Sequence, residues 1–286
     1  MSETSSNRFI AFQGEPGANS HIACNQRYPG MVPLPCPTFE DVFAAITDKR
    51  ADLGMIPIEN SLYGRVADIH HLLPDSNLYI IAEHFLHVQF QLLSVKGASM
   101  KGIKRVLSHV QALGQCRKYI RSHGFEPVIE ADTAGSARIV AQAGDPTIAA
   151  IAPKLAGEIY GLDVLDNDIQ DAAHNTTRFV IMAREPDDAD PHDGPVMTSF
   201  LFRVRNVPAS LYKAMGGFAT NGVNMTKLES YQIGGSFNAT QFYADIEGHP
   251  SERNVRLALE ELEFFCSHLR ILGVYRADAY RRSVQQ

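Results

Sequence analysis

The sequence predicts an α/β protein in two parts, an open-sheet domain followed by a smaller sandwich of strands and helices. Up to about residue 184, short apolar runs alternate with segments whose apolar residues recur at helical spacing, which is typical of strands joined by helical crossovers. After an acidic, proline-rich stretch the pattern restarts as strand, helix, strand, strand, helix and strand, over about 90 residues. That order is typical of a ferredoxin-like sandwich.

In the first part, apolar runs predict the strands and amphipathic segments predict the helices. The strands are expected at 9–12, 53–56, 106–107, 126–130, 148–151 and 179–182, and the helices at 18–28, 39–49, 112–122, 134–143 and 153–160. The stretch 78–95 has little helical periodicity, and its length indicates a strand that leaves one sheet and enters another. These elements would form two small lobes with a cleft between them, and such clefts commonly bind ligands.

The second part begins after a linker at 185–195, which is rich in proline and aspartate and poor in apolar residues. Strands are expected at 198–204, 225–232, 238–246 and 269–274, and helices at 209–220 and 252–266.

The composition excludes several classes of protein. The 286 residues suffice for two domains, and a formal net charge of −6 disfavours non-specific binding to nucleic acid or to acidic membranes. The four cysteines are far apart and form no Cys-x-x-Cys pair, which indicates a reducing compartment and no zinc site. Residues 1–7 are expected to be disordered and are not a signal peptide, and no apolar run has the length of a membrane span. We therefore expect a cytoplasmic protein.

The most informative polar cluster is the run Asn175-Thr176-Thr177-Arg178-Phe179, which leads into the apolar strand at 179–182. Open α/β sheets bind their ligands at the ends of strands. Hydroxyl and amide donors beside an arginine suit an anionic substrate whose leaving oxygen needs a proton. The alternative is a loop with a helix-capping threonine and a surface arginine.

Polar residues also follow predicted strands at four junctions where a helix is expected to begin. The candidate ligand-binding side chains at these junctions are Ser20, Glu59, Asn60, Ser61, Ser108, Thr133 and Ser136. The alternative at each junction is that a polar residue only caps the helix. The cap would be Asn19 or Ser20 at the first junction and Asn60 or Ser61 at the second. At the third it would be Ser108, followed by an exposed His109. Adjacent His70 and His71 point in different directions on a helix, so we interpret them as structural.

Together these motifs resemble the prephenate dehydratase family. The matching segments, in order, are 14–20, 56–64, 108–116, 132–137, 149–162 and 175–179, and residues 196–286 resemble a regulatory ACT domain. The resemblance implies a catalytic domain at 8–184 whose two lobes, 8–84 with 170–184 and 85–169, are similar to periplasmic binding proteins. It implies no cofactor and no metal. Because the matching segments begin near the start of the chain, we expect a monofunctional enzyme.

The resemblance also implies roles for particular residues. The resemblance makes Thr177 the essential residue, and we expect Glu59, Asn60 and Ser61 as further catalytic residues. The substrate-binding candidates are Ser20, Ser108, Thr133, Ser136, Asn175, Thr176 and Arg178. Arg178 would either hold a substrate carboxylate or brace the strand, and Val110 stands where the family often has proline.

The ACT-like segment implies regulation by L-phenylalanine and assembly into a homodimer or homotetramer. The candidate regulatory residues are Ala209, Ser210, Leu211, Asn224, Glu229 and Ser230. Three positions depart from the family motifs, since Ala209 replaces glycine, Tyr231 replaces arginine and Gln232 replaces proline. The sequence thus leaves phenylalanine inhibition open.

Two other functions remain open at this point. Arogenate dehydratase performs the same chemistry on the aminated substrate, and a single residue could decide between the two. A non-catalytic amino-acid sensor could also combine ligand-binding lobes with an ACT domain, although the intact run Thr177-Arg178-Phe179 argues against it.

Overall fold

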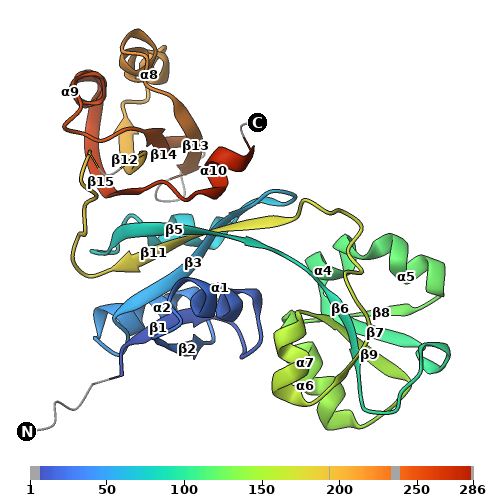
Figure 1. Ribbon diagram of the computed structural model, residues 1–286. Helices are drawn as coiled ribbons and strands as arrows, with labels where there is room; N and C mark the ends of the chain where they lie inside the picture. The colour runs from blue at the N-terminus through green and yellow to red at the C-terminus, as the bar shows by residue number, and fades with distance from the viewer. Residues whose placement is uncertain (1–6, 193, 233–238, 285–286) are drawn as a thin grey trace, which may run out of the picture. The chain divides into compact units, whose positions relative to one another are not determined.

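The computed structural model describes residues 7–192, 194–232 and 239–284 (Figure 1). Most of the segment predicted to be disordered, 1–7, lies outside these residues. The chain divides into two compact units, one formed by residues up to 66 with 85–179 and the other by 67–84 with the chain from 180 onward. The described helices include none with the length and apolar content that a membrane span requires.

The first sheet has the strand order β2-β1-β3-β11-β5, with the short β4 paired to β3. Its strands are β1 (Phe9–Gln13), β2 (Val32–Cys36), β3 (Leu53–Asn60), β4 (Gly64–Arg65), β5 (Tyr79–His87) and β11 (Thr176–Ala183). β1 is parallel to both β2 and β3. The helices α1 (Asn19–Arg27) and α2 (Phe39–Thr47) contact β1 and β3, as crossovers between parallel strands must.

The second sheet has the order β10-β6-β9-β7-β8 and lies wholly within the first unit. Its strands are β6 (Gln91–Ser94), β7 (Arg105–His109), β8 (Glu126–Glu130), β9 (Ile148–Ala152) and β10 (Asp163–Asp166). The helices around it are α4 (Val110–Gln115), α5 (Arg117–His123), α6 (Thr133–Ala143) and α7 (Lys154–Tyr160).

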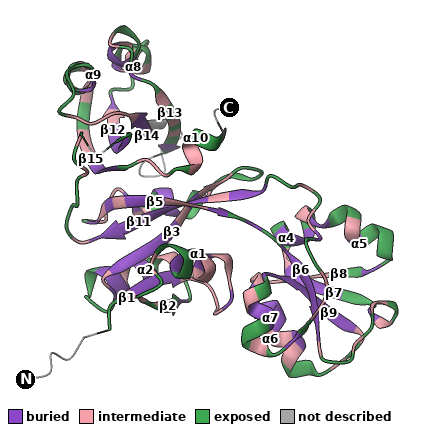
Figure 2. Ribbon diagram, viewed as in Figure 1, coloured by how far each residue is buried: buried purple, intermediate pink, exposed green. Residues whose placement is uncertain are grey.

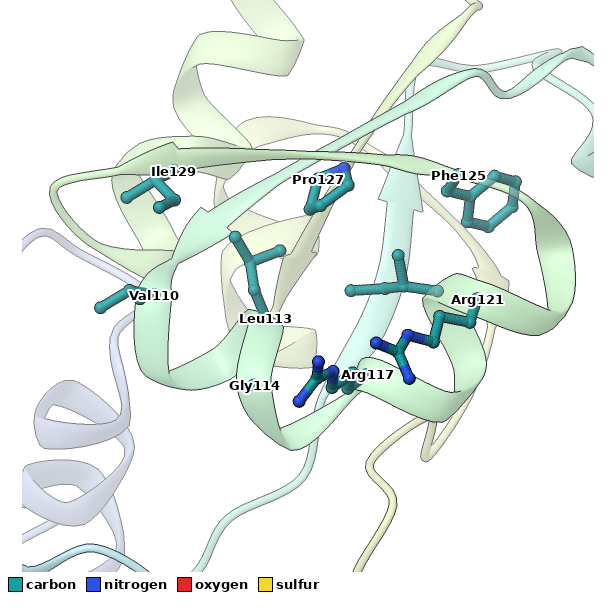
Figure 3. A pocket seen from close by; sticks show the side chains of 9 residues that line it. Val110, Leu113, Gly114, Arg117, Arg121, Phe125, Pro127 and Ile129 are labelled. Atoms are coloured by element: carbon teal, nitrogen blue, oxygen red, sulfur yellow. The ribbon is translucent and has the colours of Figure 1, made fainter.

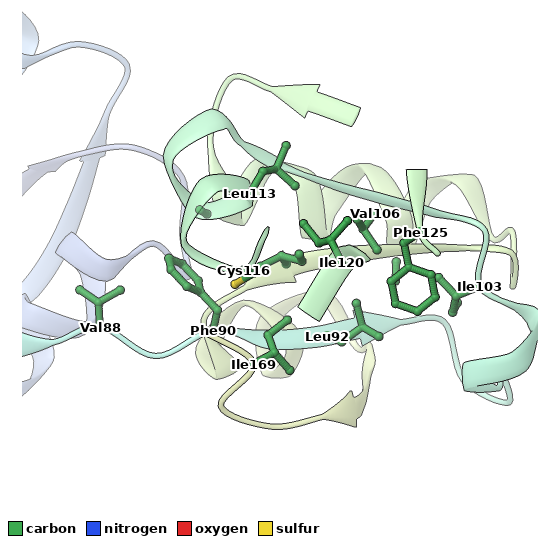
Figure 4. Packing of buried hydrophobic residues seen from close by; sticks show 13 residues of the cluster. Val88, Phe90, Leu92, Ile103, Val106, Leu113, Cys116, Ile120, Phe125 and Ile169 are labelled. Atoms are coloured by element: carbon green, nitrogen blue, oxygen red, sulfur yellow. The ribbon is translucent and has the colours of Figure 1, made fainter. Parts of the chain in front are cut away.

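The alternation of side chains along β7 and β9 builds two separate cores on the two faces of this sheet. Val106 packs with residues of α4 and α5, as Figure 4 shows, and Ile151 belongs to the same core. Leu107 and Ala150 pack instead with residues of α6 and α7. Every residue of β9 is buried, which is typical of a strand covered on both faces. Figure 2 shows the same contrast between buried strands and the exposed outer surfaces of the helices.

The prediction that 78–95 leaves one sheet and enters another is confirmed, because β5 belongs to the first sheet and β6 to the second. The prediction of a single helix at 112–122 is wrong. The chain forms α4 and α5 with a break at Cys116, whose side chain is buried in the core. Asp171 stabilises the break, since its backbone N–H donates to the Gln115 carbonyl at 2.7 Å and its carboxylate accepts from the Lys118 N–H at 3.0 Å.

The C-terminal part forms the predicted βαββαβ sandwich. Its elements are β12 (Val196–Val204), α8 (Ser210–Thr220), β13 (Met225–Gln232), β14 (Ala239–Glu247), α9 (Arg253–Phe265) and β15 (Cys266–Arg276). The strand order β13-β14-β12-β15, with antiparallel neighbours, is that of a ferredoxin-like sheet. Phe200 and Phe202 of β12 pack with Phe218 of α8 and Leu262 of α9 in one core.

The segment 67–84 belongs to the second unit because its side chains pack against the C-terminal sheet. His70 of α3 (Ala67–Leu72) is 2% exposed, stacks on Tyr231 at 4.9 Å between ring centroids, and shares a hydrogen bond of 2.9 Å with its hydroxyl. Glu83 binds Arg281 of α10 (Tyr280–Val284) through two contacts of 2.6 and 2.8 Å. The interpretation of His70 as a structural residue therefore agrees with its packing.

Candidate functional site

The candidate site forms where the end of β3 meets the start of β11, two neighbouring strands of the first sheet. Asn60 is the last residue of β3, and Asn175 immediately precedes Thr176, the first residue of β11. Residues 115 positions apart in the sequence therefore contact one another directly.

The side-chain amide of Asn60 holds this meeting point together. Its Nδ2 donates to Asn175 Oδ1 at 2.8 Å and to Thr177 Oγ1 at 3.0 Å, and the Thr176 carbonyl lies 3.3 Å away. Its Oδ1 accepts from the backbone N–H groups of Leu62 and Tyr63 at 2.9 and 3.1 Å. The amide orientation is fixed by partners at both ends.

Thr177 therefore uses its hydroxyl oxygen as an acceptor. A hydroxyl group has one proton to donate and two lone pairs. Since Asn60 occupies a lone pair, the Thr177 hydrogen remains for a donor bond of its own. The side chain is half-buried. This geometry suits donation to the oxygen of a bound ligand.

Gln115, at the end of α4, extends the network. Asn175 is fully buried, and its Nδ2 donates to Gln115 Oε1 at 2.8 Å. The amides of Gln115, Asn175 and Asn60 thus form a continuous chain that ends at the Thr177 hydroxyl. Gln115 is not among the residues predicted from the sequence, although it lies in the matching segment 108–116. The available signal is a second glutamine one helical turn after Gln111.

Ser61 and Thr176 join the two strands through hydrogen bonds, with Ser61 exposed and Thr176 buried. Ser61 Oγ donates to the His174 carbonyl at 2.9 Å and accepts from the Thr176 N–H at 3.0 Å. The Ser61 N–H donates in turn to the Thr176 carbonyl at 2.9 Å. These bonds continue the pairing of β3 and β11 past the end of β3.

Arg178 and Glu59 form an ion pair next to the amide network. Arg178 Nη1 lies 2.8 Å from Glu59 Oε1, and their side chains are 3% and 32% exposed. An arginine buried to this extent needs a paired carboxylate, because an uncompensated buried charge is strongly destabilising. The ion pair joins the neighbouring strands β3 and β11.

The remaining candidates of the first unit lie outside this network. Ser108 and Ser136 are fully buried, and their hydroxyls donate to the backbone carbonyls of Ile151 and Asp132 at 2.5 and 2.7 Å. Thr133 is the half-buried first residue of α6.

The predicted caps at two junctions are wrong. His109 caps α4, with Nδ1 accepting from the Gln111 N–H at 3.3 Å, in place of Ser108. The N-cap of α1 is Ala18, so neither Asn19 nor Ser20 takes that role. Ser20 is a nearly buried residue inside α1.

The glycine-containing loop at 14–20 packs against the helices of the second sheet. Gly17 has a φ of +96°, and a Cβ there would lie 2.7 Å from the Cα of Ala156 in α7. Glu15 binds Arg138 of α6 through contacts of 2.9 and 3.2 Å. The Gly17 N–H donates to His21 Nδ1 at 3.0 Å, and burial lowers the pKa of His21, so the imidazole is neutral near pH 7. The close approach that glycine permits is used here for packing.

The candidate regulatory residues lie at the start of α8 and along β13. Ala209, the N-cap of α8, has a φ of +62°, a left-handed conformation that glycine adopts without strain. Ser210 and Leu211 begin the helix, and Asn224 immediately precedes β13. Glu229 lies within β13 and pairs with Lys227 at 3.2 Å, and Ser230 is exposed.

The described residues contain no group of three or more His, Cys, Asp or Glu side chains that could hold a metal ion. Burial raises the pKa of the Cys24 and Cys116 thiols to about 12, so neither provides a thiolate nucleophile at neutral pH. The chemistry available at the site is hydrogen bonding by amides and hydroxyls.

Comparison with known proteins identifies relatives along nearly the whole chain. The family described as prephenate dehydratase matches residues 10–187. A Komagataeibacter europaeus protein named bifunctional N-acyl-homoserine lactone acylase/prephenate dehydratase is 50% identical over 96% of this chain and 98% of its own. The Arabidopsis thaliana arogenate dehydratase/prephenate dehydratase 1 is 38% identical over 95% of this chain and 73% of its own.

Solved structures agree with the fold. GqqA, described as a novel type of quorum quenching acylase, has a TM-score of 0.90 at 50% identity and covers 96% of this chain and all of its own. Prephenate dehydratase from Arthrobacter aurescens in complex with L-Phe has a TM-score of 0.87 at 28% identity, covering 94% of this chain and 90% of its own.

The Gln115 contact predicts an effect on stability. Gln115→Ala should lower the free energy of unfolding of the first unit by about 1–3 kcal/mol, because the buried Asn175 amide loses its acceptor. Gln111→Ala, an exposed glutamine on the same helix, should change it by less than about 0.5 kcal/mol. Urea unfolding followed by circular dichroism measures both. Equal effects of the two substitutions would contradict a structural role for the Gln115 side chain.

Proposed function

The chain belongs to the prephenate dehydratase family, and we propose that it converts prephenate to phenylpyruvate in the biosynthesis of L-phenylalanine. The family consists of lyases that act by dehydration and decarboxylation. The observation that supports the assignment best is the Asn60–Thr177 contact, in which the Thr177 hydroxyl oxygen accepts and its proton is left to donate to a ligand.

The reaction couples two bond cleavages. As the carbon–carbon bond to the ring carboxylate breaks, its electron pair enters the ring. The ring then expels its hydroxyl group as the carbon–oxygen bond, the second of the two bonds, breaks. The products are carbon dioxide, water after proton transfer, and an aromatic ring. Formation of that ring makes the reaction favourable, so the enzyme has to position the substrate and assist the leaving oxygen.

We assign that assistance to Thr177. Its hydroxyl would donate to the departing oxygen, while Asn60 Nδ2, at 3.0 Å from Oγ1, supports the negative charge that grows on the threonine oxygen. A positioned proton donor typically accelerates a reaction about 10²–10⁴-fold. Since threonine is a weak acid, much of the effect would come from preorganised hydrogen bonding, which is worth about 3–4 kcal/mol per donor.

The substrate is a dianion, and its carboxylates need donors. Arg178 is engaged with Glu59, so both are assigned to bracing the two strands. Ser61, Thr176, Ser108 and Ser136 bind backbone groups, so we assign them to support of the site. The hydroxyl candidates that remain for a carboxylate contact are Thr133, half-buried at the start of the eleven-residue α6, and Ser20, nearly buried inside α1.

We further propose that the C-terminal sandwich is an ACT domain that binds L-phenylalanine. The related prephenate dehydratase from Arthrobacter aurescens was solved in complex with L-Phe. The residues proposed to bind it here are Ala209, Ser210, Leu211, Asn224, Glu229 and Ser230. Tyr231 stands where the family motif has arginine. Its hydroxyl shares a hydrogen bond with His70, so we do not assign it to ligand binding. We expect the enzyme to work as a homodimer or homotetramer.

The relatives also support two alternative activities. Plant relatives carry arogenate dehydratase in their names, and arogenate differs from prephenate by an ammonium group in place of a keto group. The bacterial relative with 50% identity adds N-acyl-homoserine lactone acylase, which makes amide hydrolysis a second candidate on the strength of that identity.

Thr177→Val tests the proposed role of the hydroxyl, since valine is close in shape to threonine but has no proton to donate. We expect kcat for phenylpyruvate formation to fall at least about 100-fold, with an unchanged circular dichroism spectrum. Thr177→Ser keeps the hydroxyl and should retain a much larger share of activity. A Thr177→Val enzyme with near-parental kcat would rule out the assignment.

Steady-state rates with prephenate, arogenate and an N-acyl-homoserine lactone distinguish the candidate activities. We expect kcat/KM for prephenate to exceed that for each of the others at least tenfold, and L-phenylalanine to change the prephenate rate. A larger kcat/KM for arogenate would assign the plant-type activity. Tight L-phenylalanine binding without turnover of any substrate would indicate the sensor instead.

A further inference from the structure

A groove lies between the helices α4 and α5 and the edge strand β8, and we call it the α4–β8 groove. Its volume is about 510 Å³, within the usual range of small-molecule sites. β8 is the last strand of its sheet, so one side of the groove is an uncovered edge. The residues that line the groove take no part in the Asn60–Thr177 network.

The groove has an apolar floor and an apolar far rim. Leu113, Ile120 and Phe125 form the floor and belong also to the buried core of this sheet. Two large side chains at the open edge remain in contact with water, with Val110 52% and Ile129 67% exposed. A contiguous apolar surface of this kind is unfavourable in water and commonly marks a binding site.

Successive side chains of β8 point to opposite faces of the sheet, so only one set of them faces the groove. Pro127 and Ile129 line the groove, as Figure 3 shows, whereas Val128 packs on the opposite face with residues of α6. The flanking Glu126 and Glu130 share the face of Val128. The strand therefore contributes apolar groups to the groove and keeps its carboxylates away from it.

Two arginines border the groove on the side of α5. Arg117 and Arg121 are one helical turn apart, and Figure 3 shows both guanidinium groups on the same side of the groove, across from β8. No hydrogen bond or ion pair joins either guanidinium to another residue that the structure describes. The groove is thus apolar along most of its length and cationic at one border.

This charge arrangement is unfavourable for the helix itself. Like charges four residues apart repel one another, and a cation at the first residue of a helix opposes the helix dipole. Positions where a sequence breaks such local rules are often functional. An anionic group bound between the two guanidiniums would remove both penalties.

We infer that the α4–β8 groove binds a single-chain amphiphile with a terminal carboxylate, such as a saturated fatty acid of about a dozen carbons. Its carboxylate would accept charge-assisted hydrogen bonds from Arg117 and Arg121. Its chain would lie over Leu113 and Phe125 toward Ile129. The apolar lining that extends from Phe125 to Ile129 favours a long flexible chain. This inference does not depend on the proposed dehydratase activity.

Isothermal titration of the full-length protein with decanoate and dodecanoate, below their aggregation concentrations, tests the inference. We expect saturable binding of one molecule per chain, strengthened about fourfold for each added methylene. Arg117→Gln with Arg121→Gln should weaken dodecanoate binding at least tenfold. Lys118→Gln, an exposed charge on the same helix that does not line the groove, is the matched control and should bind as the parent does.

A second pair of variants tests the apolar half. Ile129→Asp should weaken dodecanoate binding about tenfold, whereas Ile159→Asp, at an exposed isoleucine on α7, should leave it unchanged. Thermal melts of all variants check that each remains folded. The inference is overturned by any of three results: no saturable binding, parental affinity in the double arginine variant, or dodecanol binding as tightly as dodecanoate.

Discussion

The side-chain amide of Asn60 is the interaction on which the candidate site depends. It joins the end of β3 to the start of β11 through Asn175 and Thr177, and it orders the following turn through the N–H groups of Leu62 and Tyr63. Loss of one of these partners would destabilise the folded protein, because an amide group in a partly buried site would then be desolvated without a hydrogen bond. These bonds fix the position of the Thr177 hydroxyl oxygen.

The surrounding residues make this arrangement rigid. Ser61 extends the pairing of the two strands, and the Glu59–Arg178 pair crosses them. Gln115 adds a fixed acceptor from α4, whose end is itself set by the contacts of Asp171 at the break between α4 and α5. A site that works by positioned hydrogen bonds needs such support, since small displacements of a donor weaken it strongly.

The sequence predicted most strands and helices because their periodicity is local. It indicated Asn60, Asn175 and Thr177 as candidates because polar residues there lie next to an end of a predicted strand. β2 was missed since Pro33 and Pro35 interrupt its pattern, which an edge strand tolerates. The break at Cys116 depends on Asp171, more than fifty residues later. Gln115 and the burial of Arg178 follow from tertiary pairing, which no local pattern contains.

The central claim is that Asn60 acts through Thr177, and a double-mutant cycle on kcat/KM for prephenate tests it most directly. Asn60→Ala alone should lower kcat/KM at least about tenfold through loss of the contact to Thr177 Oγ1. In the Thr177→Val background the same substitution should cost less than about threefold, because the hydroxyl that it positions is already gone. Losses that simply multiply in the double variant would contradict the account.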